Sequence, residues 1–219
     1  MTSMPPNIFN QSIDDLDIEL SDDDRSFLST YAGLLTKWQR SINLVSSNTI
    51  SDLWIRHLLD SLQLLPLIDA MEKDDLILAD LGCGAGFPGL VIAGLRPDMN
   101  VHLVESDQRK CSFLQTVSRE TNISADVHNA RIEAVVAEGD FMPDIVSARA
   151  LASLEALFAY ILPWAEKNKD LRMLFLKGAR AAQEIEEARA SYDFDCEMTR
   201  SVTDNDAWLL NISNLCIKL

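Results

Sequence analysis

Uninterrupted apolar runs are short throughout this sequence of 219 residues, although 47% of its residues are hydrophobic. No stretch reaches the roughly 20 apolar residues that a helix needs to cross a bilayer. The first 24 residues also lack the basic segment and the apolar segment of a secretory signal peptide. We therefore expect a soluble globular protein that stays in the cytoplasm and has no membrane partner.

Cysteine and histidine are scarce, with four and three copies. The cysteines Cys83, Cys111, Cys196 and Cys216 are scattered and include no C-x-x-C pair. This pattern suggests neither a disulfide framework nor a zinc site. The sequence thus predicts reduced, mostly buried cysteines and no metal site.

Positive charge is also in short supply, because 19 lysines and arginines face 34 acidic residues, for a net charge of -15. Such a chain repels nucleic acid as a whole, so any nucleic-acid substrate has to meet a local basic patch. Seven acids and no base stand before residue 25, and we interpret residues 1–24 as an acidic, partly flexible leader. The candidates for a local patch, with an ordinary solvated surface as the alternative, are Lys37, Arg40, Arg56, His57, Arg109 and Lys110.

Two helices are predicted near the N-terminus. Apolar residues recur at helical spacing within residues 27–38, and acids precede them. A second helix is predicted across residues 51–66, closing near Pro66. We therefore interpret residues 25–70 as an N-terminal helical extension.

From residue 71 onward, apolar runs alternate with helical stretches. Strands that alternate with helices predict right-handed βαβ units and a doubly wound α/β fold, with a mostly parallel sheet and helices on both faces. Residues 71–219 therefore form one domain in this interpretation, and with no sign of oligomerisation we expect a monomer. The predicted strands cover residues 75–82, 100–106, 125–130, 143–150, 171–178, 196–202 and 207–219, with the last two as closing, antiparallel candidates.

Five of the eight glycines fall in one short stretch, directly after an apolar run that ends in an acid. Ligands of open α/β sheets bind at the carboxyl ends of the strands, and glycine lets the backbone approach a ligand closely. One frame, Gly84-x-Gly86-x-x-Gly89, matches the dinucleotide-binding fingerprint. The other frame is D-x-G-x-G-x-G, which begins at Asp80 and adds Gly82. S-adenosylmethionine-dependent methyltransferases use this second pattern around the methionine end of their cofactor.

Two acids bear on the choice between these frames. Glu105 ends the second predicted strand, where an acid can bind a ribose hydroxyl in either class. Asp80 favours the methyltransferase frame, because the methionine part of the cofactor carries an ammonium group and a nicotinamide dinucleotide has no such group there. A tight turn without a ligand is the structural alternative.

The fourth predicted strand ends in Ser147-Ala148-Arg149-Ala150. It has neither the Asn/Asp-Pro-Pro-aromatic box of enzymes that methylate exocyclic amines nor a cysteine nucleophile. A ring nitrogen with a lone pair, such as N7 of guanine, needs neither device, because it holds no proton to remove. Alignment and electrostatics would then supply the catalysis.

Arg149 and Lys177 close the fourth and fifth predicted strands, at the edge where this fold binds ligands. We interpret both as residues on the acceptor side, with Lys177 holding a phosphate or orienting the guanine. A surface ion pair is the structural alternative for each. His57 and Asp60 lie three residues apart on a predicted helix, and we interpret them as a structural hydrogen-bonded pair, since methylation of N7 requires no base.

Several segments together resemble one family. Over residues 30–180 the chain is similar to the bacterial small-subunit ribosomal RNA guanine-N7 methyltransferases, also called the glucose-inhibited division protein B family. The segments that carry this resemblance, in the family's order and approximate spacing, are INLVS, WIRHLLDSL, DLGCGAGFPGL, ESDQRKCSFL, SARALASL and LFLKG.

The resemblance implies a class I, Rossmann-like methyltransferase fold with S-adenosylmethionine as the cofactor and N7 of a guanine in 16S ribosomal RNA as the acceptor. It implies cofactor contacts for Gly82, Phe87 and Glu105, with Ile132 and Glu133 near the adenine. It also implies that Arg149 contacts the cofactor and lies near the acceptor. The implied partner is the RNA itself or the assembling small subunit. The acidic leader and the segment around residues 128–142 depart from the family pattern.

Two other classes of function stay open at this point. A nicotinamide-dependent oxidoreductase is disfavoured by Asp80. A binding module for ribosome assembly that keeps the fold without turnover is disfavoured by the intact glycine loop.

Overall fold

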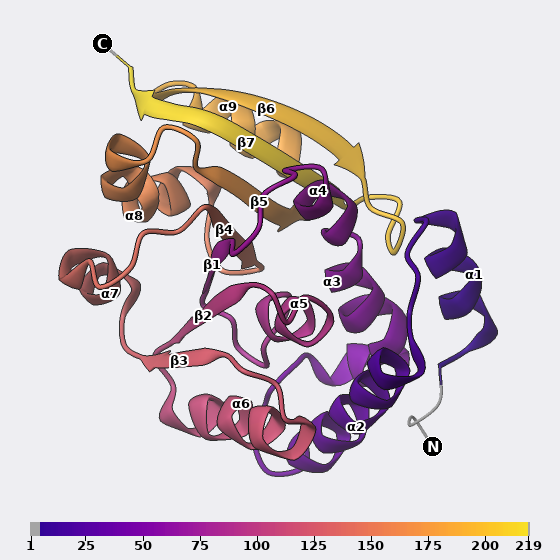
Figure 1. Cartoon of the computed structure of the whole chain (residues 1–219). Coiled ribbons are helices and arrows are strands. Elements are labelled where there is room, and N and C mark those ends of the chain that lie inside the picture. Colours follow the sequence, from indigo (N-terminus) through magenta and orange to yellow (C-terminus); the bar gives the residue numbers. More distant parts are fainter. Residues whose placement is uncertain (1–4, 219) are drawn as a thin grey trace.

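The computed structural model describes residues 5–218, so residues 1–4 of the predicted leader and Leu219 of the last predicted strand lie outside it. Seven strands form one sheet: β1 (Ile77–Leu81), β2 (Asn100–Glu105), β3 (Asp126–Asn129), β4 (Ile145–Arg149), β5 (Arg172–Lys177), β6 (Tyr192–Arg200) and β7 (Trp208–Ile217). Their order across the sheet is β3-β2-β1-β4-β5-β7-β6. β1 to β5 are parallel, and β7 runs antiparallel between β5 and β6 (Figure 1). The predicted doubly wound, mostly parallel α/β fold is therefore confirmed.

The helices cover both faces of this sheet (Figure 1). One face buries the N-terminal helices together with α5 and α6, and the other buries α7, α8 and α9. Adjacent strand residues alternate between the two cores, as Leu78 and Ala79 do in β1. The helices are α1 (Asn7–Asp15), α2 (Asp22–Trp38), the 3₁₀ helix η1 (Ser47–Asp52), the π-helix η2 (Trp54–Leu59), α3 (Asp60–Leu62), α4 (Leu65–Asp69), α5 (Gly89–Leu95), α6 (Gln108–Thr121), α7 (Ile132–Glu138), α8 (Leu154–Lys167) and α9 (Ala181–Ala188).

The N-terminal extension packs closely against the helix that follows the glycine loop. Ser21 caps α2 in a reciprocal capping box with Asp24, and the acids of the first turn suit the positive end of the helix dipole. Phe27 of α2 lies so close to α5 that a Cβ on Gly94 would overlap its ring. The extension and the sheet domain therefore share one core.

The sequence pattern did not predict α1, which lies inside the acidic leader. Phe9 and Ile13, one helical turn apart, are both 1% exposed. The Phe9 ring meets Trp54 edge to face at 5.0 Å between centroids. Because the acids of the leader dominate its composition, they hide this short apolar stripe, which places α1 against η2.

The second predicted helix differs from the structure. Residues 51–66 do not form one α-helix but the end of η1, then η2 and α3. Pro66 does not close the run, because it lies in the first turn of the next helix, α4. A proline is tolerated there because the first N–H groups of a helix have no partner within the helix.

Candidate active site

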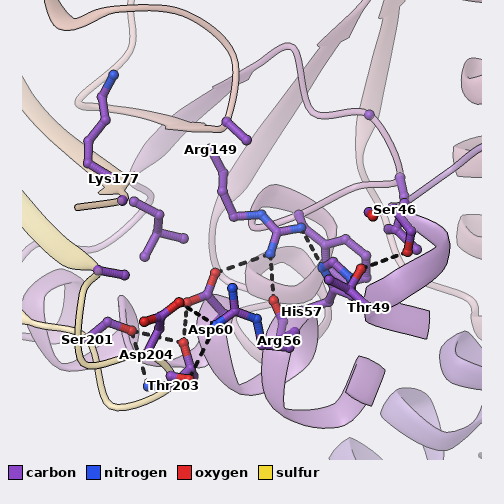
Figure 2. Close-up of a pocket in the computed structure, with 18 of the residues that line it drawn as sticks. Ser46, Thr49, Arg56, His57, Asp60, Arg149, Lys177, Ser201, Thr203 and Asp204 are labelled. Carbon is purple, nitrogen blue, oxygen red and sulfur yellow. Dashed lines mark hydrogen bonds and ion pairs between the residues drawn. The ribbon is translucent and has the colours of Figure 1, made fainter. Parts of the chain in front are cut away.

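A cavity of about 550 Å³ lies at the carboxyl ends of β1, β4 and β5, the edge predicted from the fold. The glycine loop forms one wall, and η2 with the segment before it forms another. The loop between β6 and β7 closes the remaining side (Figure 2). Three segments that are distant in sequence therefore enclose a single site.

The glycine loop has the conformation that its glycines permit. Gly82, Gly84 and Gly86 have φ angles of 59°, 58° and 93°. A Cβ on Gly86 would approach the Tyr31 hydroxyl to 2.7 Å, so Gly86 is needed for packing. A Cβ on Gly84 would have its nearest neighbour 3.9 Å away, in the backbone of the loop itself. Gly84 therefore faces open space on the cavity side, where a ligand can approach the backbone.

Asp80 lies beneath the loop and not in the cavity wall. Its side chain is 0% exposed, and its carboxylate accepts hydrogen bonds from the Gly89 N–H at 2.8 Å and from the Ser147 hydroxyl at 2.9 Å. Burial raises the pKa of Asp80 from 3.8 to about 7. In this arrangement Asp80 ties β1 to β4 and to the start of α5, and does not present its carboxylate to a ligand.

Glu105 fixes the other side of the loop. One carboxylate oxygen accepts from the Gly84 N–H at 3.0 Å and the other accepts from the Asp107 N–H at 2.8 Å. The Lys110 ammonium lies 3.9 Å from the same carboxylate and lines the cavity. Glu105 thus holds the end of β2 against the loop that a cofactor would contact.

Ile132 and Glu133 open α7, and neither belongs to the cavity lining among residues 5–218. They stand close to the β2 end, because the Ala130 N–H donates to the Glu105 carbonyl at 3.1 Å. The structure therefore places them near the carboxyl end of β2, outside the cavity lining within residues 5–218.

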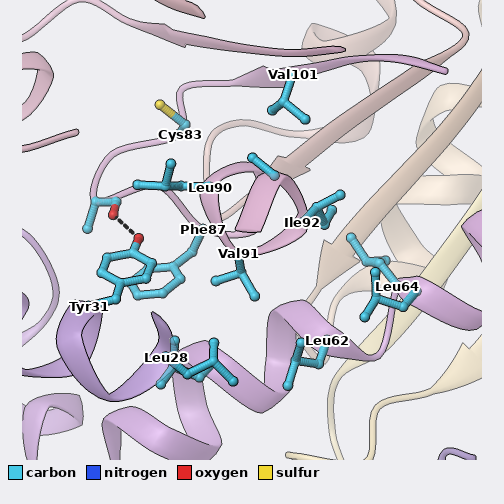
Figure 3. Close-up of a cluster of buried hydrophobic side chains, with 14 of the residues drawn as sticks. Leu28, Tyr31, Leu62, Leu64, Cys83, Phe87, Leu90, Val91, Ile92 and Val101 are labelled. Atoms are coloured by element: carbon cyan, nitrogen blue, oxygen red, sulfur yellow. Dashed lines mark hydrogen bonds between the residues drawn. The ribbon is translucent and has the colours of Figure 1, made fainter. Parts of the chain in front are cut away.

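Phe87 is the aromatic centre of the site. Its ring stacks on Tyr31 and on His57, with 5.2 Å between centroids in both cases. The guanidinium carbon of Arg149 lies 5.0 Å from the centre of the same ring. Tyr31 also donates its hydroxyl proton to the Ala85 carbonyl, as Figure 3 shows. The N-terminal extension therefore supports the glycine loop from below.

Arg149 is held by three contacts from η2 and α3 (Figure 2). Its Nη1 donates to the Arg56 carbonyl at 2.9 Å and to the Asp60 carboxylate at 3.1 Å, and its Nη2 lies 2.9 Å from His57 Nδ1. An arginine only donates, so His57 Nδ1 accepts and the ring proton is on Nε2, which donates to Thr49 Oγ1 at 2.9 Å. Arg149 does pair with an acid, but inside the cavity and not on the surface.

His57 is neutral in this arrangement. Burial, then the positive charges of Arg149 and Arg56, lower the pKa of His57 from 6.5 to about 3. The direct hydrogen bond predicted between His57 and Asp60 is replaced by contacts of both side chains with Arg149. A π-helix carries His57, and single π-turns often occur at functional sites.

Lys177 also lines the cavity, apart from the Arg149 contacts (Figure 2). Its ammonium donates to the Ala152 carbonyl at 2.6 Å and to the Glu184 carboxylate at 2.8 Å. Glu184 also accepts from the Leu154 N–H at 2.9 Å. The Lys177 charge is therefore matched within the protein.

A set of polar contacts that sequence analysis missed joins the β6–β7 loop to the N-terminal extension, and we call it the clasp. Its three pairs are Thr203 to Asp60 at 2.8 Å, Arg56 to Asp204 at 2.7 Å, and Gln63 to Ser201 at 3.1 Å. These partners are 138 to 148 residues apart, and nothing in their local sequence signals the pairing. The clasp holds Asp60, which in turn holds Arg149.

The predicted basic residues do not all converge. Arg56, His57 and Lys110 line the cavity, whereas Lys37, Arg40 and Arg109 are exposed outside its lining within residues 5–218. In the same described range, no cluster of three His, Cys, Asp or Glu side chains could hold a metal ion. No helix there is long and apolar enough to span a membrane.

Comparisons with known proteins agree on a family. Residues 24–208 match the family model described as rRNA small subunit methyltransferase G. The chain is 47% identical over 191 residues to the ribosomal RNA small subunit methyltransferase G of Parvibaculum lavamentivorans, covering 86% of this chain and 82% of that one. It is 40% identical over 202 residues to the protein of that name from Rhizobium leguminosarum, covering 90% and 96%. Among solved structures, magnesium protoporphyrin IX methyltransferase from Synechocystis with bound S-adenosylmethionine gives a TM-score of 0.58 at 14% identity, covering 89% and 98%.

Proposed function

The chain belongs to the rRNA small subunit methyltransferase G family, and we propose that it transfers a methyl group from S-adenosylmethionine to N7 of one guanine in 16S ribosomal RNA. The family match covers the glycine loop and the whole cavity wall up to Trp208. It favours the methyltransferase frame of the loop over the dinucleotide frame.

The observation that carries the cofactor proposal is the open space above Gly84. A glycine with positive φ and no neighbour on its Cβ side is what a closely approaching ligand requires. Glu105 and Asp80 hold this loop rigid through backbone N–H groups, and Phe87 and Arg149 stand next to it. The residues therefore fit S-adenosylmethionine, with Gly82, Gly84, Gly86, Phe87, Glu105 and Arg149 as its holders and Ile132 and Glu133 toward its adenine.

When bound, S-adenosylmethionine would supply a methyl group on a positively charged sulfur. The N7 lone pair would form the new N–C bond as the S–C bond breaks, and the electrons of the broken bond would stay on the sulfur of S-adenosylhomocysteine. Guanine N7 carries no proton, so the protein has to align the reactants and accommodate charge. No general base is needed, and His57 is committed to Arg149 as a neutral acceptor. This agreement between the chemistry and the His57 contacts supports N7 as the acceptor atom.

Arg149 is the residue that we place between the two substrates. Its three contacts use three of the five N–H donors of a guanidinium, which leaves donors for a ligand. Because Asp60 and the Phe87 ring fix the guanidinium, it costs little reorganisation to bind an anionic or carbonyl oxygen there. Lys177, at the end of the neighbouring strand β5, is the proposed contact for the acceptor nucleotide.

Methyl transfer from isotope-labelled S-adenosylmethionine tests this proposal. The acceptor is small-subunit RNA, naked or as assembled particles, from a strain that lacks this gene. We expect label in 7-methylguanosine at a single site, mapped by mass spectrometry of nuclease fragments. Label in another nucleoside would overturn the N7 assignment and leave the cofactor assignment intact.

Two binding measurements separate the other classes of function. Titration with S-adenosylmethionine followed by calorimetry should give a single site. NADH fluorescence should not change when the protein is added. A change would indicate the alternative oxidoreductase function, which needs that cofactor. Tight S-adenosylmethionine binding without turnover on any form of the small subunit would favour a binding module instead.

A further inference from the structure

A row of three side chains crosses the sheet at the mouth of the cavity. Trp208, the first residue of β7, pairs with Lys177 at the end of β5 and with Arg200 at the end of β6. Residues directly opposite each other on neighbouring strands point to the same face of a sheet. The row therefore leads outward from the cavity wall to the loop end of the β6–β7 hairpin.

Arg200 and Trp208 form a stacked pair in this row. The guanidinium carbon of Arg200 lies 4.4 Å from the centre of the Trp208 ring. Arg200 is exposed, whereas Trp208 is half-buried, packs against the core on the α8 side and also lines the cavity. Arg200 also donates to the Asn205 carbonyl, which anchors it to the loop. A guanidinium is thus held in place over an indole ring at the rim.

The charge of Arg200 has no acidic partner within residues 5–218, unlike that of Lys177, which Glu184 matches. Proteins that bind single-stranded RNA stack bases on aromatic rings and on arginine guanidinium planes. The pair offers both features in one place.

The size of the cavity indicates which part of the RNA reaches the Arg200–Trp208 pair. About 550 Å³ has to hold the cofactor and the reacting base, so the nucleotides on either side continue over the rim. We propose that Arg200, backed by Trp208, binds the base of a nucleotide next to the acceptor guanine in a single-stranded segment of the RNA. This inference rests on the proposed function and adds to it an unpaired RNA conformation and a second base-binding subsite.

A second arginine–aromatic pair has different surroundings from the Arg200–Trp208 pair. Arg189 lies over the Phe194 ring at 4.5 Å and donates to the Phe194 carbonyl at 3.2 Å. Phe194 is 5% exposed and does not line the cavity. That pair closes the end of α9 over the core, so an arginine stacked on another ring of the same hairpin serves as a matched structural control.

The test compares Arg200→Ala, Arg200→Lys, Trp208→Ala and Trp208→Phe with the control Arg189→Ala. Each variant is assayed for affinity to small-subunit RNA by filter binding, for KM in methyl transfer, and for S-adenosylmethionine affinity. We expect Arg200→Ala and Trp208→Ala to weaken RNA binding about ten-fold and to raise KM for RNA similarly, because a stacked base contributes at that scale. Affinity for S-adenosylmethionine should stay unchanged in the Arg200 variants, and Trp208→Phe should keep most of the RNA affinity that Trp208→Ala loses.

Arg200→Lys decides between stacking and charge alone. A lysine keeps the charge but has no plane, so a stacking subsite predicts a loss close to that of Arg200→Ala. Wild-type affinity in Arg200→Lys would overturn the base-stacking proposal, and so would losses equal to those of Arg189→Ala in all four variants. Arg200 is exposed, so its variants decide the question even if Trp208→Ala folds poorly. A wild-type protein that binds the RNA without methylating it would contradict the proposed function, while the binding contrast would still decide this inference.

Discussion

The glycine loop and the Arg149 side of the cavity are built over different sequence distances. Two backbone N–H groups of the loop region are held by carboxylates nearby in the sequence, from Asp80 to Gly89 over 9 residues and from Glu105 to Gly84 over 21, and Tyr31 supports the loop from 54 residues away. Arg149 is held by residues 89 to 93 positions away, and the clasp spans 138 to 148. The cofactor side is therefore more local than the acceptor side, whose contacts all join distant parts of the chain.

The two sides of the cavity should therefore respond differently to mutation. A change in the glycine loop should weaken cofactor binding directly, because few residues form that part of the site. A change on the acceptor side should spread through Arg149, Asp60 and the clasp, because each of these groups holds the next. Variants on each side, assayed separately for cofactor affinity and for RNA methylation, test whether the two sides respond independently.

Arg149→Ala should have the largest effect. Removing the guanidinium takes away the proposed ligand contact and leaves the half-buried carboxylate of Asp60 without its charge partner. We expect kcat/KM for RNA methylation to fall about 100- to 1,000-fold, a scale typical of losing a preorganised electrostatic contact. Arg149→Lys should recover little, because lysine lacks the planar fork that reaches Arg56, Asp60 and His57 together. Activity within three-fold of wild type would remove Arg149 from the site.

Asp80→Asn tests the loop side through pH. Asp80 has a pKa of about 7 in the folded protein and 3.8 as its ordinary value, so the folded state holds its proton more tightly. The stabilising contribution of that proton is full below pH 4 and is lost as pH rises through 7. Asparagine has no charge to bury; its amide oxygen can accept from the Gly89 N–H, and its amide N–H can donate to the Ser147 hydroxyl in place of the bond that Asp80 accepts.

The expected result is a pH-dependent gain in stability. Relative to wild type, the free energy of unfolding of Asp80→Asn should rise by roughly 2–4 kcal/mol between pH 5 and pH 8. Urea unfolding at several pH values measures this difference. A gain of equal size at pH 5 and pH 8 would show that Asp80 is ionised across that range.

The comparison of the two sides also explains what the sequence could predict. The α/β alternation, the glycine loop and the placing of Arg149 and Lys177 at strand ends follow from local pattern and fold topology, and all three are present. The role of Asp80 could not be read from spacing. Its position two residues before Gly82 fits a ligand contact as well as a buried tie, and only the packing of Gly89 against it distinguishes them.

The missed elements have a common cause. The clasp joins a hairpin to a helix over more than half the chain, and no local periodicity encodes such a pairing. The π-helix η2 reads as an ordinary amphipathic helix, because its apolar residues keep near-helical spacing. The charge of the leader likewise hides Phe9 and Ile13, which place α1. In each case a tertiary contact determines the structure, and the local sequence pattern does not reveal that contact.

Gly84→Ala tests whether the cofactor lies against the backbone of the glycine loop. A methyl group there would enter the space where we place the cofactor, at a backbone with φ of 58°. Gly139→Ala is the matched control, because Gly139 has φ of 66° and no neighbour within 4 Å of an added Cβ, outside the cavity lining. Both variants should lose about 1 kcal/mol of stability to backbone strain. Only Gly84→Ala should weaken S-adenosylmethionine binding, by about ten-fold in calorimetry. Equal cofactor affinities in the two variants would place the ligand elsewhere.

Thr203→Val should have the smallest effect, because it removes the hydrogen bonds of one hydroxyl, to Asp60 and to Ser201, and keeps the shape of the side chain. The Asp60 oxygen that it frees still accepts from Gln63 at 2.8 Å, so the cost should be about 1 kcal/mol. Because Asp60 holds Arg149, we expect kcat/KM for RNA methylation to fall about five-fold with S-adenosylmethionine affinity unchanged. Thr199→Val, at an exposed position on the preceding strand β6, is the control for a change of residue type alone. A loss of cofactor affinity in Thr203→Val would show that the clasp also supports the glycine loop, and the two sides of the cavity would then be one cooperative unit.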